Sequence, residues 1–488
     1  MGTLTGRPEQ QDHDGSAHGP HPDGRCSAVV VGAGITGLTA AHALRQQGVS
    51  VTVLDAAAQA GGVMRTTHAD GFVAEHGPNS FVSSPVVEQL LSALDLQQDV
   101  VEPDASANKR YVVRDGDLHA FPLTPRAMLT TRLLSTRAKL RVLLEPLVPR
   151  YRGPGEESIA SFVRRRLGRE VLDYAVDPFV SGIFAGDPDT LSMAHAFPRV
   201  TELEMVHGSL SRGLMAQRRR ARSGGSGQPS APASPARLVS FVDGVQTLPD
   251  ALAASLGTSL HLSRPLRHLH AHEGRWVVES GDDGKSHTLI ADTVVLATPA
   301  HALAAMELPA ALRRFAAPIE HVRYPAVSTL TLGFTRQQVA HPLDGFGMLV
   351  PRVEQRSVLG VLFSSSLFPA RAPEGHVTLT VFVGGARAPQ QAALSSEALL
   401  PAVLRDLHDL LGVTGDPVYT HHAYWPRAIP QYLLGYQEVK DAVARTEAEH
   451  PGLYLAGNYH LGVSVGDCVA NGVLTAERVA SYLGRSAS

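Results

Sequence analysis

The sequence predicts an α/β protein made of several units. A buried-strand run, SAVVV at 27–31, leads into a helical pattern that stops at Gly48, and a second strand run, VSVTVLD, ends at Asp55. Residues 258–299 return to strand patterns separated by EG and DDG turns. The chain has 488 residues, 44% of them hydrophobic and 18% charged, which is enough for about three domain-sized units.

The first strand–helix–strand unit carries a phosphate-binding pattern. Its turn reads G-x-G-x-x-G, with Gly32, Gly34 and Gly37 at the fixed positions. Gly32 permits the tight turn, Gly34 allows a pyrophosphate to approach the backbone, and Gly37 lets the helix pack on the strand. Asp55, about 20 residues further on, is placed to hold a ribose hydroxyl. The unit therefore predicts a Rossmann-type dinucleotide site.

Composition limits the partners and the compartment. The formal net charge is −3 and the pI is near 6.8, so no surface-wide field attracts nucleic acid, and none is predicted as a partner. Two cysteines, Cys26 and Cys468, fit a reducing compartment, and cytoplasm is the default location. We expect residues 1–26 to be a disordered tail, because Gly, Pro, His and Asp without an apolar core cannot offset the entropy of ordering.

From about 113 to 200 the pattern is helical and basic. Arg and Lys recur between Leu and Val in TPRAMLTTRLLSTRAKLRVLLEPLVPRYRGPG, which fits either a solvated bundle face or an amphipathic surface on anionic lipid or a partner. Taken alone, the pattern favours the solvated face. The Gly/Ser/Pro-rich stretch 216–237 is predicted to be a mobile loop. His268, His270 and His272 alternate on one predicted strand but lack the partners of a known metal site, so no metal is predicted.

The stretch GVSVGD at 462–467 matches the G-x-S-x-G pattern of a nucleophilic serine. A nucleophile elbow needs an acid and then a histidine downstream, and no histidine follows Ser464. The strand before it and the helix start after it instead suit a flat ring that accepts hydrogen bonds from backbone N–H groups. We therefore interpret this stretch as part of the cofactor site.

Further motifs follow in order: GGVMRT, EHGPNSF, NKRYVVRDGDLHAFP, DPFVSGIFAGDPDTLS, DGVQTLP, GFGMLVPR, SSSLFPARAPEG, FVGGAR, AIPQY and AGNYHLGVSVGDC. With GAGITGL, they closely resemble the protoporphyrinogen oxidases, the oxygen-dependent FAD enzymes of the amine oxidase superfamily that act in haem and chlorophyll synthesis. The resemblance covers about residues 27–486. Coproporphyrinogen III oxidases of the same family, amine or carotenoid oxidoreductases, and a flavoprotein without turnover remain the alternatives.

The resemblance implies FAD as the cofactor and a porphyrinogen as the substrate, oxidised by molecular oxygen. Arg110 is implied to pair with a substrate propionate, and Leu349, Leu362 and Phe382 to sandwich the macrocycle; no acid or base is assigned. The implied FAD contacts lie at both ends of the chain: Gly32, Ala33, Gly34, Ile35, Thr36, Gly37, Asp55, Gly62, Val63, Gly77, Pro78, Asn79, Ser80, Leu266, Asn458, Val463, Ser464 and Val465.

The resemblance also implies a division of the chain. The FAD-binding domain takes residues 27–102, 240–302 and 446–486, and the substrate-binding domain takes 103–110, 206–239 and 303–445. Residues 111–205 correspond to a helical membrane-associating domain, which reverses the preference for a solvated face and predicts peripheral contact with the inner face of the cytoplasmic membrane. A homodimer is left open.

Overall fold

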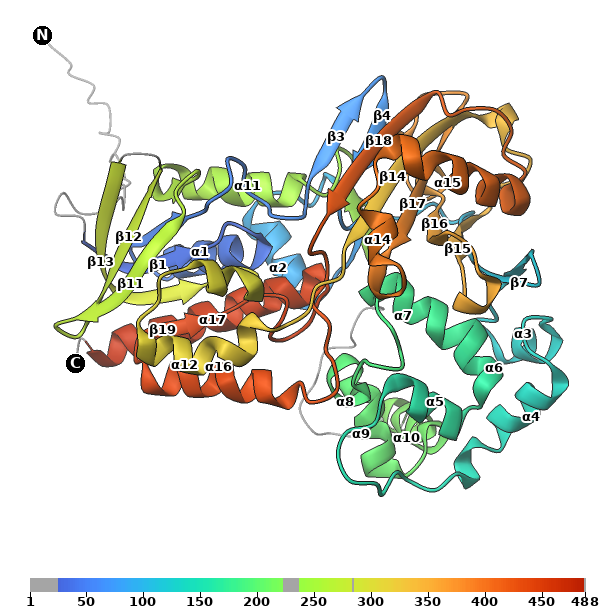
Figure 1. Cartoon of the computed structure of the whole chain (residues 1–488), viewed down its shortest axis with the longest axis horizontal. Coiled ribbons are helices and arrows are strands. Elements are labelled where there is room, and N and C mark those ends of the chain that lie inside the picture. Colours follow the sequence, from blue (N-terminus) through green and yellow to red (C-terminus); the bar gives the residue numbers. More distant parts are fainter. Residues whose placement is uncertain (1–24, 223–236, 283–284, 487–488) are drawn as a thin grey trace, which may run out of the picture.

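The computed structural model describes residues 25–222, 237–282 and 285–486 (Figure 1). The predicted tail lies outside these residues except for its last two, which already belong to the first strand, β1 (Arg25–Val31). The predicted loop 216–237 is wrong at its start, because α10 (Leu210–Arg222) continues through it. Gln and Arg are good helix formers, so the basic start of the stretch extends the helix. The rest of that loop lies almost wholly outside the described residues.

The first of two large sheets carries the predicted dinucleotide unit. Its strand order is β10-β2-β1-β13-β12-β11, and β19 also pairs with β13. The strands β2, β1, β13 and β19 run parallel, and β11 and β12 form the antiparallel meander that the sequence predicts. The bounds are β2 Val51–Leu54, β10 Leu260–His261, β11 Leu266–His272, β12 Arg275–Asp282, β13 Lys285–Leu296 and β19 Leu453–Leu455.

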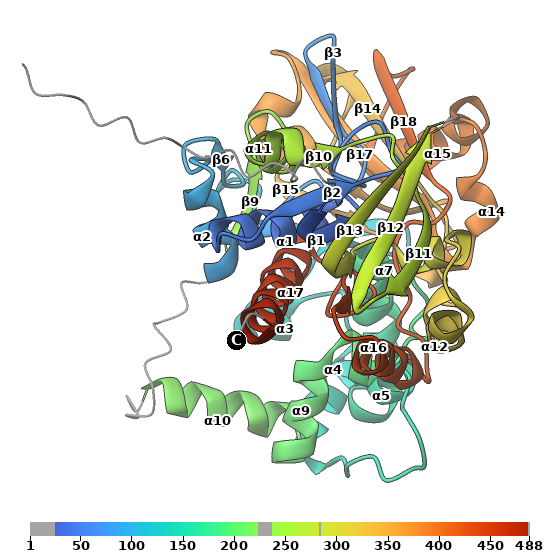
Figure 2. The ribbon, with the colours of Figure 1, turned by 90° about the vertical axis from the view of Figure 1, so that its left-hand side faces the viewer.

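The two ends of the chain pack together on this sheet. Helix α1 (Ile35–Gln46) lies against α17 (Val465–Ser486), as Figure 2 shows in blue and red. A Cβ on Gly472 of α17 would lie 2.6 Å from the carbonyl oxygen of Thr36, so the absence of a side chain there sets how closely the helices approach. This packing brings residues 465–472 beside the first glycine loop.

The second large sheet has the order β18-β14-β17-β16-β15-β7-β8. One face packs on α15 (Ser396–Leu411) through buried Val and Leu side chains. The strand bounds are β7 Lys109–Arg114, β8 Asp117–Ala120, β14 Val327–Thr335, β15 Gly345–Leu349, β16 Val358–Leu362, β17 His376–Gly384 and β18 Tyr419–Trp425.

Small strands and further helices connect the two sheets. Strands β3 (Thr66–Ala69) and β4 (Phe72–Glu75) form a hairpin, and β9 (Leu238–Phe241) pairs with β5 (Phe81–Val82) and β6 (Val100–Val101). The connecting helices are α2 Pro85–Ala93, α11 Thr247–Leu256, α12 Ala310–Glu320, α13 Ser364–Leu367, α14 Pro389–Ala392 and α16 Gln437–Glu449. The short 3₁₀ turns are Gly257–Ser259, Ala300–Ala305, Arg336–Gln338, Arg352–Glu354, Pro369–Arg371 and Gly385–Arg387.

A helical unit hangs below the second sheet in Figure 1. Its elements are α3 Pro125–Thr130, α4 Thr136–Leu143, the 3₁₀ turn Glu145–Leu147, α5 Ile159–Arg166, α6 Arg169–Val171, the π turn Leu172–Val176, α7 Asp177–Phe184, α8 Met193–Ala196, α9 Pro198–His207 and α10. Within the described chain, no helix is long and apolar enough to cross a membrane.

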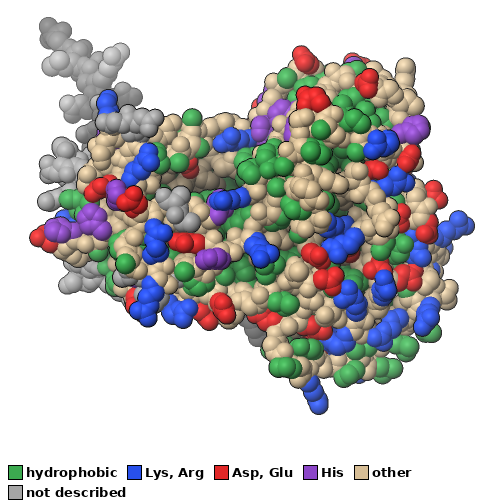
Figure 3. Space-filling view, in the orientation of Figure 1, with side chains coloured by type: hydrophobic (Ala, Val, Ile, Leu, Met, Phe, Trp, Pro, Cys, Tyr) green, Lys and Arg blue, Asp and Glu red, His purple; other side chains and the backbone are tan. Residues whose placement is uncertain are grey.

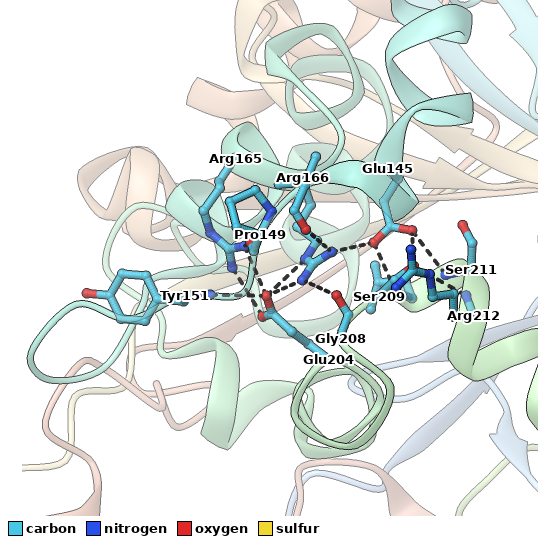
Figure 4. Close-up of polar contacts among 12 residues, drawn as sticks. Glu145, Pro149, Tyr151, Arg165, Arg166, Glu204, Gly208, Ser209, Ser211 and Arg212 are labelled. Atoms are coloured by element: carbon cyan, nitrogen blue, oxygen red, sulfur yellow. Dashed lines mark hydrogen bonds and ion pairs between the residues drawn. The ribbon is translucent and has the colours of Figure 1, made fainter.

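A buried polar cluster joins several of these helices (Figure 4). The guanidinium of Arg166 is fully buried and donates to Glu145 at 2.7 Å and to Glu204. The carboxylate of Glu145 also accepts from the hydroxyl of Ser209 and from the first backbone N–H of α10, on Leu210. The charges are therefore compensated inside the unit, and the cluster fixes where α10 begins.

Candidate active site

The first glycine loop leaves room for a diphosphate at the start of α1. A Cβ on Gly37 would lie 1.9 Å from the carbonyl oxygen of Gly32, and Gly32 has a φ of 111°, so both positions need glycine. A Cβ on Gly34 would instead meet nothing within 4 Å. No side chain caps the helix at Gly34. The N–H groups of Ile35, Thr36 and Gly37 therefore form a free anion site.

Asp55 lies at the end of β2, beside this loop. Its carboxylate accepts hydrogen bonds from the backbone N–H of Ala33 at 2.5 Å and of Ala57 at 2.7 Å. The backbone N–H of Arg264 reaches the carbonyl oxygen of Asp55 at 2.7 Å, which brings the start of β11 close. Leu266 itself is 7% exposed, so its backbone, rather than its core-packed side chain, is what the site could use.

The second glycine pair, Gly61 and Gly62, and the segment after β4 extend the strip of surface that begins at the first glycine loop. The backbone N–H of Gly61 donates to the carbonyl oxygen of Ala33 at 2.8 Å, and a Cβ on Gly62 would touch the Cα of Gly34 at 3.4 Å. A Cβ on Gly77 would lie 2.4 Å from the carbonyl oxygen of Val63. Pro78, Asn79 and Ser80 follow directly, and the carbonyl oxygen of Asn79 is held by the hydroxyl of Ser240 at 3.1 Å.

The C-terminal residues meet the other end of this strip. A Cβ on Gly466 would lie 3.2 Å from the carbonyl oxygen of Val82, so the start of α17 borders the segment that follows Ser80. Asn458 is half-buried just after β19, and Val463 lies in the turn before α17. The hydroxyl of Ser464 accepts from the N–H of Asp467 at 3.1 Å and donates to its carboxylate at 2.6 Å. Ser464 is thus a helix cap, as its place before α17 requires.

Together these segments fit an extended dinucleotide. A continuous series of contacts runs from Asp55 through the first glycine loop and the second glycine pair, Gly61 and Gly62, to the start of α17. Val63 is 41% exposed between the exposed Gly62 and the buried Met64, and such an apolar side chain is one that a flat ring could cover. FAD contacts at the positions named from the sequence stay a prediction, and the side chain of Leu266 packs in the core.

The three predicted macrocycle residues share one face of the second sheet. Leu349 and Phe382 both pair with Gly360, from opposite sides, and Leu362 lies two residues along the same strand. Paired residues point to the same side of a sheet, so these side chains project together, away from α15. All three are only partly buried, whereas their neighbours on the other face are core residues. Gly182 of α7 packs against Leu349 from above the face.

Arg110 lies at one edge of the same face. It pairs with Gly347, which in turn pairs with Leu362, so its side chain projects on the side of the apolar residues. Its guanidinium lies 5.4 Å from the ring centre of Phe346. In the described chain no carboxylate forms an ion pair with it, whereas the adjacent Lys109 pairs with Asp344 at 2.5 Å. Arg110 is therefore an exposed cation available to an acidic ligand.

Known proteins share this whole architecture. The family described as flavin containing amine oxidoreductase matches residues 35–480. The chain belongs to this family. Protoporphyrinogen oxidase 2 of Arabidopsis thaliana is 35% identical over 93% of the chain and 94% of its own length, and coproporphyrinogen III oxidase of Bacillus subtilis is 29% identical over 94% and 99%. The predicted membership of the porphyrinogen oxidase group, with FAD as the cofactor of an oxidoreductase, is confirmed.

Solved structures agree with the fold. A candidate protoporphyrinogen oxidase from Exiguobacterium sp. 255-15 has a TM-score of 0.76 at 26% identity, over 93% of this chain and 98% of its own. Cyclohexylamine oxidase from Brevibacterium oxydans IH-35A has a TM-score of 0.66 at 18% identity, over 94% and 99%. The second likeness shows the fold alone, and it confirms the amine oxidase architecture for this flavin oxidoreductase.

Some residues near the site were not singled out from the sequence. His76 immediately precedes Gly77, and its ring centre lies 4.5 Å from that of His421 on β18. Burial, together with His421 and Arg65, lowers the pKa of His76 to about 4, so the ring is neutral near pH 7. The indole N–H of Trp425 donates to the carbonyl oxygen of His76 at 2.8 Å. His76 belongs to the motif EHGPNSF, but only its contact with His421 on the second sheet shows that it lies near the site.

Across the described ranges, no three His, Cys, Asp or Glu side chains come close enough to hold an ion. The Nδ1 atom of His268, the first of the three alternating histidines, lies 3.1 Å from a carboxylate oxygen of Glu307.

Proposed function

We propose that this flavin oxidoreductase converts protoporphyrinogen IX to protoporphyrin IX. The observation that carries the proposal is the wall of Leu349, Leu362 and Phe382 with an unpaired Arg110 at one edge. A tetrapyrrole is broad and apolar and bears its carboxylates at one edge, so it matches both features. The curated relatives with 33–36% identity over most of the chain are named protoporphyrinogen oxidases, which supports the same substrate.

The reaction removes six electrons and six hydrogens from the porphyrinogen, and three O₂ become three H₂O₂. FAD, held by the glycine segments and the start of α17, would supply the redox chemistry that links the porphyrinogen to oxygen. The protein binds, orients and shields the substrate: the apolar wall excludes water from one ring face, and Arg110 fixes the ring by its acidic edge. The pyrrole nitrogen lone pairs assist the loss of hydrogen from the ring carbons, and the protons leave to water, so no side-chain base is assigned.

The charges around the wall favour a substrate with acid at one edge. Four nearby cations already have acidic partners, in the pairs Lys109–Asp344, Arg114–Glu170, Arg352–Asp187 and Arg387–Asp177. Coproporphyrinogen III carries four propionates, so two more would need cations of their own. An anion left without a partner beside apolar groups is costly. This argument favours the protoporphyrinogen substrate over the coproporphyrinogen one.

A porphyrin fluorescence assay tests the proposal. Purified protein with added FAD is given each porphyrinogen anaerobically and then oxygen, and the appearance of porphyrin is recorded. We expect kcat/KM for protoporphyrinogen IX to exceed that for coproporphyrinogen III by about tenfold or more, which corresponds to about 1.4 kcal/mol. A preference for coproporphyrinogen would overturn the substrate, and turnover of an amine with neither porphyrinogen would overturn the reaction class.

We also propose that the helical unit rests on an anionic membrane surface. In this unit, acidic side chains are buried while apolar ones beside them are exposed. Glu145 is buried and the nearby Leu147 is 75% exposed, and Glu204 is buried and Met205 is 69% exposed. Further exposed apolar residues are Leu123, Leu129, Leu140 and Leu143. Figure 3 shows Lys and Arg mixed with hydrophobic side chains over this unit, at the lower right. Apolar groups ringed by cations suit the headgroup boundary of acidic lipid.

Liposome cosedimentation tests this contact. We expect the protein to pellet with anionic vesicles at low salt, and the double variant Leu143→Glu, Leu147→Glu to stay in solution. The matched control is the double variant Leu394→Glu, Val418→Glu, which places the same two charges on exposed apolar residues outside the helical unit. Equal pelleting of all three proteins, or none by the wild type, would contradict the proposal.

A further inference from the structure

Two buried tyrosine hydroxyls hold the backbone that carries Asn458. The hydroxyl of Tyr432 donates to the carbonyl oxygen of Asn458 at 2.5 Å, and that of Tyr436 donates to the carbonyl oxygen of Tyr459 at 2.6 Å. Tyr432 and Tyr436 are 5% and 4% exposed, with ring centres 4.7 Å apart. Tyr324 reaches the side-chain oxygen of Asn458 at 3.4 Å. The turn after β19 is thus held by residues from outside the first sheet.

The same segment touches the predicted macrocycle wall. Phe382 packs against a small buried cluster of Ala185, Val327 and Leu359, and Ala428 and Ile429, just before Tyr432, pack against the same cluster. The buried amide of Gln431 donates to the carbonyl oxygen of Phe184 at 2.8 Å, at the end of α7. Gly182 of α7 lies close to Leu349. The stretch 428–432 therefore shares packing partners with the predicted wall, and through Tyr432 it holds the turn that bears Asn458.

Burial raises the pKa of Tyr432, so its hydroxyl stays protonated and remains a donor over the whole working range of pH. The hydrogen bond joins this buried ring to the carbonyl oxygen of the half-buried Asn458. Removing the hydroxyl leaves that carbonyl without its partner, and such a loss costs more than the bond contributes. The turn would then shift toward another partner, and Asn458 with it.

We propose that Tyr432 is a positioning residue that sets the flavin-binding turn at Asn458 against the macrocycle wall. It touches neither reactant by this assignment and acts through the backbone of Asn458. The role rests on the proposed function for the wall, but its effect on the cofactor does not depend on which porphyrinogen is oxidised. Segment 428–432 therefore fixes the distance between the flavin ring and the substrate ring, which hydride transfer requires to be short.

The test compares Tyr432→Phe with Tyr454→Phe in the full-length protein. Tyr454 also donates from its ring hydroxyl to a backbone carbonyl, that of Arg478 at 3.4 Å, in the second half of α17 and away from the start of that helix. FAD affinity is measured by titrating the apoprotein with FAD, and the flavin absorption spectrum and the reduction potential are recorded for each holoprotein. Melting temperatures with and without FAD are recorded in parallel.

We expect Tyr432→Phe to bind FAD about five- to a hundredfold more weakly, with a shifted flavin spectrum and a lower kcat at unchanged KM. Tyr454→Phe should match the wild type in all flavin readings. Wild-type FAD affinity and spectrum in Tyr432→Phe, or equal loosening by Tyr454→Phe, would overturn the proposal. Should Tyr432→Phe not fold, Tyr324→Phe must weaken FAD binding in the same direction, and wild-type affinity there would overturn it too. Failure of the proposed function would appear separately, as no porphyrin from wild-type holoprotein.

Discussion

Replacing Arg110 by alanine gives the sharpest test of how the substrate is held. The guanidinium is exposed, lies over the ring of Phe346, and lacks a carboxylate partner among the described residues. Because no internal ion pair is broken, the variant should fold normally and lose only its contact with the substrate. A charged hydrogen bond contributes about 1.5–3 kcal/mol, so kcat/KM for protoporphyrinogen IX should fall about ten- to a hundredfold.

The structure offers a control one residue away. Lys109→Ala removes an equal charge from the same strand, but Lys109 is paired with Asp344 and projects to the other side of β7. Long-range effects of charge on substrate approach are shared by both variants and are screened by salt. Their ratio at moderate salt therefore isolates the direct contact. Arg110→Lys should recover part of the loss, since it keeps the charge but not the planar fork.

Initial rates of porphyrin fluorescence at limiting substrate give kcat/KM, and FAD content per protein confirms an intact cofactor site. The reasoning is refuted if Arg110→Ala stays within about twofold of the wild type, less than the 1.4 kcal/mol that a tenfold change represents. It is also refuted if Lys109→Ala falls as far, because the effect would then come from net charge and not from position.

Four other perturbations test the fold and the site. Arg166→Met should destabilise the protein by about 3–5 kcal/mol in urea unfolding, because Glu145 and Glu204 are left buried without their cation; unchanged stability would mean that the cluster is dispensable. Burial alone raises the pKa of Glu145, but hydrogen bonds from Ser209 and two backbone N–H groups lower it to about 2. A depressed carboxyl pKa stabilises the fold above its usual value near 4.5 and loses that effect as pH falls toward 2, so acid unfolding by circular dichroism should flatten over this range in Glu145→Gln. Gly37→Ala should abolish FAD uptake, since its methyl would lie 1.9 Å from the carbonyl oxygen of Gly32, and a yellow holoprotein would contradict that reading. Ser464→Ala should cost about 0.5–2 kcal/mol of stability as a lost helix cap, and labelling of Ser464 by a serine-reactive fluorophosphonate in the wild type would show instead that it is a nucleophile.

The first glycine loop could be predicted from the sequence because its reason is local. Within six residues, the turn requires Gly32, the packing of the helix requires Gly37, and Gly34 leaves open space for a ligand. The contact between Gly466 and Val82 joins residues almost 400 positions apart, and no period or spacing indicates it. Resemblance to a family supplied that pairing. Tyr432 was missed for the same reason: its partner, Asn458, is fixed only when the two sheets meet.

The three arginines 164–166 show the limit of reading charge from composition. In sequence they are alike and indicate a solvated face, yet their side chains are 48%, 22% and 0% exposed. Each residue turns a helix by about 100°, so consecutive cations point to different surroundings, and only the tertiary fold decides which meets a carboxylate. Because Arg166 draws Glu145 and Glu204 inward, Leu147 and Met205 beside them are turned outward. The apolar surface proposed to meet lipid is thus a consequence of the buried ion cluster, and loosening the cluster by Arg166→Met should weaken vesicle binding as well as the fold.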